Sequence, residues 1–486
     1  MSRTPSVLDN YPEYELTIGI EVHVQLATGT KIFCTCANEI SKEPNKNICQ
    51  ICTGQPGVLP VLNKKVVDSA ILAGLAINCS ITRVNEFDRK HYFYPDLPKG
   101  YQITQAYKPI CVNGFVPIRL EDGSIKKIGI NRIHMEEDAG KNIHAGSENE
   151  SFVDLNRAGT PLLEIVTNPD MSSTHEAKAY LKALHSIVTY LGITSGNMEE
   201  GAFRADTNIS VRKKGQKELG TKCELKNINS FKFIGDAVEY EIERQIELLE
   251  QGGKVRQETR LWDTKDKKTF VMRTKEEAAD YRYFTDPDLP VIHLDDAWIN
   301  RIKATMPELP DEKLKRFVAQ HGLSEYEAEI LVNDQELARY YEAAHKLHAS
   351  KQVINWILRD LISYLNENKL TASQCSLTPQ RLVELVQLLE SGKINNHAAK
   401  EVFLIVAQSG SAPAAVVKEK GLEQIGSSDE LEKVIKELVQ KYPDEVAQYK
   451  SGKEKVFGFF VGLAMKQTQG KGNPKIIQDL LKKHLS

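Results

Sequence analysis

The chain has 486 residues, of which 41% are hydrophobic and 27% are charged. This length suggests about three domains, and the balance is typical of globular proteins, which excludes a mainly disordered or fibrous chain. The 63 Lys and Arg residues nearly match the 66 Asp and Glu residues, giving a formal net charge of -3. Any nucleic-acid partner must therefore be bound by local basic patches.

The sequence offers no segment expected to enter a membrane. The longest apolar run, from Val456 to Met465, is about half as long as a membrane-spanning helix. The first residues include Asp9 and Glu13 and no apolar stretch typical of a secretory signal. We therefore expect a cytoplasmic protein, and in that reducing compartment its eight cysteines indicate metal binding or catalysis rather than disulfides.

The first predicted strand runs from Thr17 to Leu26, where apolar and polar residues alternate. Ile18, Ile20, Val22, Val24 and Leu26 share one face. Gly19, Glu21, His23 and Gln25 share the other. One strand thus presents a carboxylate and an imidazole on the same side of a sheet.

Four cysteines follow this strand with a metal-ligand spacing. Cys34 and Cys36 form one pair, and Cys49 and Cys52 form a second pair shortly afterwards. Four thiolates can bind one tetrahedral Zn²⁺, and no neighbouring general base or open ligand position indicates a catalytic metal. We predict a structural zinc site; two buried pairs or free thiols are the alternative.

Two segments interleave aromatic and basic residues: Phe87 to Pro95, and Asp280 to Phe284. Aromatic faces beside Arg and Lys are typical of sites for a nucleotide or a single-stranded RNA end. Such runs are also common in protein cores. The sequence contains no P-loop and no kinase glycine-rich loop, so any use of ATP must rely on other residues.

Later strand-like segments repeat the polar face of the first strand. Asp206, Asn208, Ser210 and Arg212 alternate with apolar residues, and so do Lys222, Glu224 and Lys226. The acidic run Glu136-Glu137-Asp138 follows a strand-like stretch from Ile128. A sheet face with His, carboxylates, Lys and Arg suits Mg²⁺ and phosphates. The alternative is an ordinary charged surface facing water.

Helix signals divide the chain into three expected domains. Residues 1–297 should form a mixed α+β domain, with one helix after the capping pair Ser173 and Glu176 and another through residues 234–249. Residues 298–408 should be all α, with helix starts at Ser324 and at Thr378-Pro379. Residues 409–486 form the expected tail, which follows a predicted hinge at residues 409–413.

Six segments resemble the B subunit of the tRNA-dependent aspartyl/glutamyl-tRNA amidotransferases, and the resemblance covers nearly the whole chain. They are IGIEVHVQL (18–26), FDRKHYFYPDLPKGYQITQ (87–105), HMEEDAGK (134–141), DLNRAGTPLLEIV (154–166), GAFRADTNISVR (201–212) and ELKNINSF (224–231). The end, with Gly472-Asn473-Pro474 before an amphipathic helix, is similar to the family's YqeY-like tail. The resemblance implies an α+β fold: an antiparallel-sheet cradle domain related to the glutamine synthetase fold, then a helical domain and a tail that contacts tRNA.

The resemblance also implies an ATP-dependent carbon–nitrogen ligase. Proteins of this family use ATP and Mg²⁺ to phosphorylate the side-chain carboxylate of a mischarged Asp-tRNA(Asn) or Glu-tRNA(Gln), and ammonia then displaces the phosphate. An amidase-type glutaminase partner supplies the ammonia, and a small third partner joins the glutaminase to the tRNA-dependent component in a heterotrimer.

Site residues follow from the resemblance by position. Those that match the family's Mg²⁺ site are Glu21, His23, Glu136, Glu137 and Asp206, with Glu224 as a further candidate. Cys34, Cys36, Cys49 and Cys52 match a zinc site that only part of the family retains. From charge and motif position, Arg89, Lys90, Arg157 and Arg204 are expected to contact phosphates.

Two other functions remain as alternatives from the residues. One is a non-catalytic tRNA-binding module built around zinc, in which the carboxylates only face water. The other is a self-sufficient glutaminase-amidotransferase, but the sequence has no Ser/Gly-rich amidase signature and no nucleophilic Cys in a recognisable context.

Overall fold

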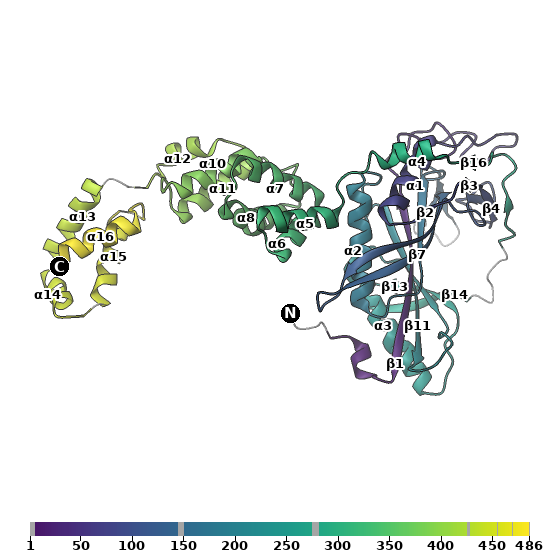
Figure 1. Cartoon of the computed structure of the whole chain (residues 1–486), viewed down its shortest axis with the longest axis horizontal. Helices are drawn as coiled ribbons and strands as arrows, with labels where there is room; N and C mark the ends of the chain where they lie inside the picture. Colours follow the sequence, from purple (N-terminus) through teal and green to yellow (C-terminus); the bar gives the residue numbers. More distant parts are fainter. Residues whose placement is uncertain are drawn as a thin grey trace. The chain divides into compact units, whose positions relative to one another are not determined.

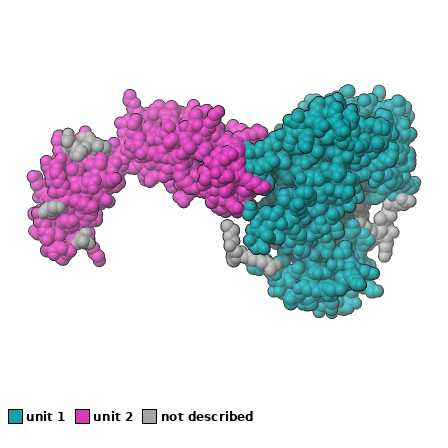
Figure 2. Space-filling model, viewed as in Figure 1, with its two compact units in different colours: residues 1–313 teal, residues 314–486 magenta. Residues whose placement is uncertain are grey.

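The computed structural model describes residues 5–143, 150–274, 281–424, 428–453, 455–468 and 470–485 (Figure 1). It divides into two compact units, residues 1–313 and residues 314–486 (Figure 2). The first unit contains the strands and the second is helical, which confirms the mixed α+β architecture.

The first unit is organised around one large sheet. In the described residues its strand order is β14-β13-β12-β11-β1-β10-β7-β6-β2, and neighbouring strands are antiparallel except β12 and β13. The strands are β1 (Tyr14–Gln25), β2 (Ser80–Ile81), β6 (Cys111–Arg119), β7 (Ile125–Glu137), β10 (Pro161–Thr167), β11 (Phe203–Lys213), β12 (Cys223–Lys226), β13 (Glu258–Asp263) and β14 (Lys268–Thr274).

Strand β1 lies between β10 and β11 and shows the predicted alternation. Ile18, Ile20 and Val22 are fully or almost fully buried, whereas Glu21 and His23 are only half-buried. The apolar face belongs to the main core of the unit. Because side chains alternate along a strand, the polar face is left on the opposite side of the sheet.

Helices pack on the apolar face. Residues of α1 (Lys64–Ala76), α2 (Thr174–Tyr190) and α3 (Phe231–Glu250) share one core with the sheet. The Ser173 hydroxyl caps α2 by accepting from Glu176 N, as predicted, but the Glu176 carboxylate returns to Ser172 N (2.6 Å) rather than to Ser173 N. The helices α1–α3 thus leave the polar face of the sheet to other segments.

Short strands build the remaining wall of the first unit. A small sheet has the order β15-β4-β5, formed by Phe284–Thr285, Asp88–His91 and Tyr101–Thr104. The other short elements are η1 (Val7–Asn10), β3 (Val84–Asn85), β8 (Lys141–Ile143), β9 (Phe152–Asp154), β16 (Ile292–His293) and helix α4 (Asp296–Lys303). Pairing of β4 with β15 brings the two aromatic segments together. Asp280 lies outside the described residues.

The second unit consists of helices with the predicted caps. Ser324 and Glu327 form a capping box, and Thr378 caps a helix with Pro379 at its first position. The elements are α5 (Pro310–His321, which contains the unit boundary), α6 (Glu325–Val332), α7 (Gln335–Leu347), α8 (Lys351–Trp356), the π-helical η3 (Ile357–Leu361), α9 (Ile362–Asn368), α10 (Pro379–Glu390), α11 (Asn396–Ser409), α12 (Pro413–Lys420), α13 (Ser428–Lys441), α14 (Pro443–Lys450), α15 (Lys455–Gln467) and α16 (Pro474–Leu485).

The last four helices have a core of their own, to which α16 contributes Ile477, Leu480 and Leu481. The segment predicted as a hinge is the short connection between α11 and α12, where Gly410 ends α11 in a left-handed conformation. The expected boundary at 297/298 falls within α4.

Among the described helices, none combines the length and apolar character needed to cross a membrane.

Candidate functional site

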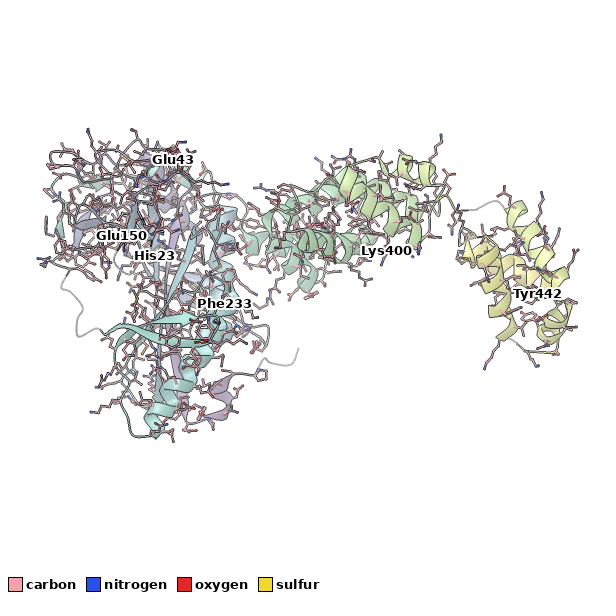
Figure 3. All side chains as sticks on the ribbon, turned by 180° about the vertical axis from the view of Figure 1, so that it is seen from behind. His23, Glu43, Glu150, Phe233, Lys400 and Tyr442 are labelled. Carbon is pink, nitrogen blue, oxygen red and sulfur yellow. The ribbon has the colours of Figure 1, made fainter. Side chains whose placement is uncertain are left out.

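A cavity of about 1150 Å³ lies over the polar face of the large sheet. Its lining includes the predicted residues Glu21, His23, Lys90, Glu136, Asp206 and Glu224. The first unit therefore brings together six sequence-predicted residues that lie on strands β1, β4, β7, β11 and β12. Figure 3 labels His23 among the side chains of this unit.

The deepest part of the polar face is a cluster of two histidines and two glutamates. In the strand register, His23 of β1 stands opposite Glu164 of β10, which stands opposite His134 of β7. His23 Nε2 lies 3.3 Å from Glu164 Oε2 and 3.4 Å from Glu136 Oε1. His134 Nε2 lies 2.9 Å from the same Glu164 oxygen. One ligand atom each from His23, Glu136 and Glu164 lies within 4.8 Å of the others, so these three residues could hold a metal ion.

Burial and mutual charge determine the protonation of this cluster. Burial lowers the pKa of His23, but the hydrogen bond and charge of Glu164 and the charge of Glu136 outweigh it and raise that pKa to about 9. Burial also raises the pKa of Glu136, with the neighbouring Glu164 charge adding to it. For Glu164 the effect of burial is overcome by His134 and His23, so its pKa lies well below the usual range.

A second polar cluster lies beside the first. Glu21 and Asp206 stand opposite each other on β1 and β11, and Asn208 Nδ2 donates to Glu21 Oε1 (3.0 Å). Lys226 forms ion pairs with Asp206 and with Glu224, the latter at 3.4 Å. Of the polar residues predicted on the three strand-like segments, the cavity lining contains Glu21, His23, Asp206, Asn208, Glu224 and Lys226. Gln25, Ser210, Arg212 and Lys222 are not part of that lining.

Glu137 is separated from its neighbour Glu136. The alternation of β7 places the two side chains on opposite faces, and Glu137 is not among the residues that line the cavity. Its carboxylate forms an ion pair with Lys99 and accepts from Ile103 N at 2.9 Å. The structure thus does not bring Glu137 together with the other predicted metal ligands.

The four predicted phosphate contacts occupy different surroundings. Lys90 lines the cavity. Burial lowers its pKa, but the charges of Glu136 and Glu164 and the nearby Tyr281 and Tyr283 together outweigh burial and raise that pKa. Arg89 forms ion pairs with Asp286 and Asp288, both at 2.7 Å. The other two arginines bind Asp138: Arg204 Nη2 at 3.0 Å and Arg157 Nε at 3.6 Å. These three arginines are outside the cavity lining.

Five tyrosines form a row along the cavity wall and its rim. Their ring centroids follow one another at 6.3 Å (Tyr107 to Tyr283), 6.0 Å (to Tyr281), 6.3 Å (to Tyr92) and 5.9 Å (to Tyr94). Neighbouring ring planes cross at 62° to 75°, so no ring covers the face of the next. Tyr94 and Tyr107 are 52% and 64% exposed. Four of these tyrosines come from the two aromatic segments of the sequence, and Tyr107 follows β5.

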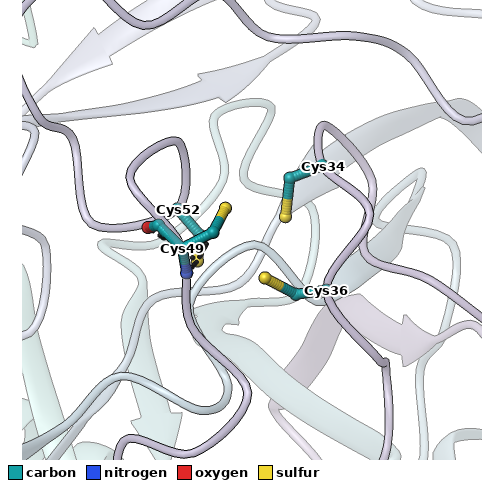
Figure 4. Close-up of side chains that lie close together, drawn as sticks. All are labelled: Cys34, Cys36, Cys49 and Cys52. Atoms are coloured by element: carbon teal, nitrogen blue, oxygen red, sulfur yellow. Dashed lines mark hydrogen bonds between the residues drawn. The ribbon is translucent and has the colours of Figure 1, made fainter.

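The four cysteines meet in the loop after β1 (Figure 4). One sulfur from each of Cys34, Cys36, Cys49 and Cys52 lies within 4.8 Å of the others. Cys49 N donates to Cys52 Sγ at 3.1 Å. A hydrogen bond from Cys34 lowers the pKa of Cys52 to about 5, whereas burial raises that of Cys36 to about 11. The arrangement could hold a metal through four thiolates.

Sequence reasoning missed Glu164, His134 and Arg132, which also line the cavity. Glu164 is a single carboxylate in the middle of the apolar strand Pro161–Thr167, and such residues are seldom buried without a partner. A lone carboxylate within an apolar strand indicates a buried, paired residue, and this pattern could have identified Glu164 from the sequence. Arg132 forms no ion pair within the described residues, and its hydrogen bond to Asn131 is 3.4 Å long.

The chain is similar to known proteins over nearly its whole length. The family described as "GatB/GatE catalytic domain" matches residues 16–300, and the family described as "GatB domain" matches residues 339–485. The chain is 53% identical to a protein of Geotalea daltonii over 97% of the chain and 99% of that relative. It is 51% identical to one of Carboxydothermus hydrogenoformans (98% and 99%) and 50% identical to one of Persephonella marina (97% and 100%). All three are named as the B subunit of an aspartyl/glutamyl-tRNA(Asn/Gln) amidotransferase.

Proposed function

The chain belongs to the family of aspartyl/glutamyl-tRNA(Asn/Gln) amidotransferase B subunits, and we propose that its cavity activates the side-chain carboxylate of a mischarged tRNA. The substrates are Asp-tRNA(Asn), Glu-tRNA(Gln) or both. The observation that carries the proposal is the polar sheet face, on which a histidine and several carboxylates meet lysines inside one cavity.

The proposed reaction has two balanced steps. A carboxylate oxygen of the aminoacyl group attacks the γ-phosphorus of ATP, the bond to the bridging oxygen breaks, and ADP leaves with the electron pair. Ammonia then attacks the carbonyl carbon of the acyl phosphate, inorganic phosphate leaves, and the nitrogen loses a proton. The product is the amide of Asn-tRNA(Asn) or Gln-tRNA(Gln). Phosphorylation is needed because a carboxylate oxygen is otherwise a poor leaving group.

The donors of the deep cluster fit Mg²⁺. Glu136 and Glu164 supply hard oxygen atoms and His23 a nitrogen, and the buried Nδ1 of His134 has no hydrogen-bond partner within the described residues. We assign His23, Glu136 and Glu164 as the core of the site, with Glu21, Asp206 and Glu224 as further oxygen ligands. Mg²⁺ bound there would offset the negative charge of the ATP phosphates and of the leaving phosphate.

The cavity also contains cationic side chains that can stabilise negative charge on a phosphoryl group. Lys90, Lys226 and Arg132 line the same space, and their charges would stabilise the transferring phosphoryl group. We retain Lys90 as a phosphate contact. The predicted contacts Arg89, Arg157 and Arg204 are paired with aspartates, and we assign them to holding the cavity wall in shape.

The tyrosine row supports a substrate with exposed bases. Successive bases of a single strand can stack on aromatic faces, and a row of five rings is longer than one adenine requires. We propose that the row receives the unpaired end of the aminoacyl-tRNA, so that its amino acid reaches the deep cluster. Lys90 Nζ lies 4.8 Å from the Tyr281 ring centroid, where it can meet a phosphate.

The remaining assignments concern partners and the outer domains. We propose that the chain works in the cytoplasm with an amidase-type glutaminase, which supplies the ammonia, and with a small third protein that joins the two. The four cysteines are proposed to hold a structural Zn²⁺. The division into domains at 297/298 and 408/409, the glutamine synthetase relationship of the first domain and tRNA binding by the tail remain our proposals.

One experiment tests the reaction. The chain, purified with its partner proteins, is incubated with ATP, Mg²⁺ and mischarged tRNA in the absence of glutamine, and hydroxylamine is added to trap the acyl phosphate as a hydroxamate. We expect ADP and hydroxamate to form in equal amounts and only with mischarged tRNA. Tight tRNA binding without ADP formation would instead favour a non-catalytic binding module.

A further inference from the structure

Lys31 is the most deeply buried lysine of the described residues, with no exposed surface. It begins the loop that carries the first two cysteines, and its backbone N donates to Cys36 O at 3.0 Å. A lysine side chain normally keeps its charged end in water. Complete burial of this one therefore needs a physical reason.

The surroundings of the Lys31 ammonium contain no carboxylate. Its Nζ donates to Asn47 O at 2.7 Å and to Leu155 O at 3.4 Å, and it lies 3.7 Å from Cys52 Sγ. No ion pair joins Lys31 to Asp or Glu within the part of the chain that the structure describes. A buried charge is costly unless an opposite charge compensates it.

The four cysteines can provide that opposite charge. Four thiolates around one divalent cation have a net charge of -2, because the cation neutralises only two of them. We infer that the Lys31 ammonium is the counter-cation of a divalent metal held by Cys34, Cys36, Cys49 and Cys52, and that it positions Cys52 for binding. This inference rests on the metal site proposed above. The spacing of the cysteines alone does not indicate this role for Lys31.

Lys31 also connects the metal loop to the polar sheet face. Its contacts reach Asn47 in the loop and Leu155 in the segment before β10, while Ile32 N donates to Gly159 O at 3.0 Å. Gly159 N in turn donates to Asp138 O, immediately after β7. A metal that fixes Lys31 and Cys52 would therefore stabilise the segment that leads into β10, the strand that carries Glu164.

A lysine that only filled space would behave differently from a counter-cation. Its hydrogen bonds to two carbonyl groups would stabilise the fold equally with and without metal. A counter-cation, by contrast, is favourable beside the metal thiolates and unfavourable once they are protonated and neutral. The coupling between Lys31 and the metal is therefore the quantity to measure.

The experiment uses the full chain and its Lys31→Met and Lys31→Gln variants, with Lys46→Met as the control. Lys46 belongs to the same loop but is exposed and lies 3.8 Å from Glu43. Gln keeps a donor for the two carbonyl groups and removes the charge. Zn²⁺ affinity is measured by competition with a chromophoric chelator, and Co²⁺ serves as a spectroscopic probe of the thiolate-to-metal transition. Thermal unfolding is followed with Zn²⁺ and after chelation.

We expect both Lys31 variants to bind Zn²⁺ about 10- to 100-fold more weakly, the range found when groups that support metal ligands are removed. The Co²⁺ charge-transfer band should move to lower energy, since thiolates without a neighbouring cation release electrons more easily. Lys31→Gln should lose melting temperature with Zn²⁺ but little or none without it. Lys31→Met also removes the donor to the two carbonyl groups, so its melting temperature should fall in both states, and further with Zn²⁺ than without it. Lys46→Met should match the unaltered chain in each measurement.

Three results would overturn the inference. If Lys31→Gln keeps the Zn²⁺ affinity and the Co²⁺ spectrum of the unaltered chain, or if the melting temperature falls equally with and without metal, Lys31 is not the counter-cation. Failure of the unaltered chain to bind Zn²⁺ would remove the metal site and the role of Lys31 together. None of these results bears on ADP formation, so the proposed reaction is tested separately.

Discussion

The cysteine cluster and the histidine-glutamate cluster of the first unit are built in different ways. The first cluster comes from one loop. Its four sulfur atoms, from Cys34, Cys36, Cys49 and Cys52, lie close enough together to bind a single metal ion. His23, Glu136 and Glu164 come from three neighbouring strands and face a cavity. Four thiolates fill the coordination sphere of a metal and leave no position for a substrate. Three donors beside a cavity leave a position open. The difference suggests stability for the first cluster and chemistry for the second.

The largest effect is expected from Glu136→Gln. This change keeps the shape of the side chain but removes one charged oxygen ligand from the deep cluster. Losing such an electrostatic contribution should lower tRNA-dependent ADP formation by about 100-fold or more, with tRNA binding and melting temperature little changed. Initial rates of ADP release at saturating ATP measure this effect.

Glu137→Gln is the matched control, because the neighbouring carboxylate faces Lys99 and the Ile103 amide instead of the cavity. We expect it to lower stability and to leave the rate of the folded enzyme within a few-fold. A rate loss equal to that of Glu136→Gln at unchanged stability would contradict the assignment of the two faces and restore Glu137 as a ligand.

The next effect concerns Cys49→Ser. Since a serine hydroxyl does not replace a thiolate at zinc, the variant should lose most of its zinc and several degrees of melting temperature. The folded fraction should still form ADP, because no cysteine of the cluster lines the cavity. Metal analysis and calorimetry measure the outcome, with Cys375→Ser, in the second unit, as a control. Unchanged zinc content would show that Cys49 is not a ligand.

These two clusters were not equally predictable. The cysteine positions follow from spacing within one loop, so local sequence was sufficient. The deep cluster depends on which strands are neighbours and on their register, and only the chain folded as a sheet places Glu164 between His23 and His134. Alternation predicted the faces of β1 and β11 correctly. The resemblance predicts both Glu136 and Glu137 at the Mg²⁺ site, but alternation within β7 places their side chains on opposite faces.

A smaller effect should follow from Tyr94→Ala. Loss of one stacking ring typically costs about 1 to 3 kcal/mol of binding free energy, so the affinity for aminoacyl-tRNA should fall about 5- to 150-fold. The KM for ATP should stay the same, which separates an RNA site from an adenine site. Tyr94→Phe should bind normally, because it keeps the ring. Tyr326→Ala changes an exposed tyrosine of α6 and serves as the control.

The tail provides a comparison between two lysines of α16, within a segment that has seven lysines in residues 451–486. Lys483 lies 3.7 Å from Glu432, whereas Lys475 forms no ion pair within the described residues. Both are exposed, beside the buried Ile477 and Leu481. Glu454, one of the two acidic residues of this segment, lies outside the described residues. Lys475 is thus the better candidate for an RNA phosphate.

The smallest effect is therefore expected from Lys475→Gln. If Lys475 neutralises one tRNA phosphate, its removal should weaken tRNA binding a few-fold and reduce the slope of log K against log salt by about 0.7 to 0.9. Lys483→Gln should change the slope less, because Glu432 already offsets part of its charge. Affinities of the full chain at several salt concentrations measure both slopes. Equal slopes in both variants and the unaltered chain would mean that neither Lys475 nor Lys483 neutralises a tRNA phosphate, and tRNA binding by the tail would then have to come from other residues.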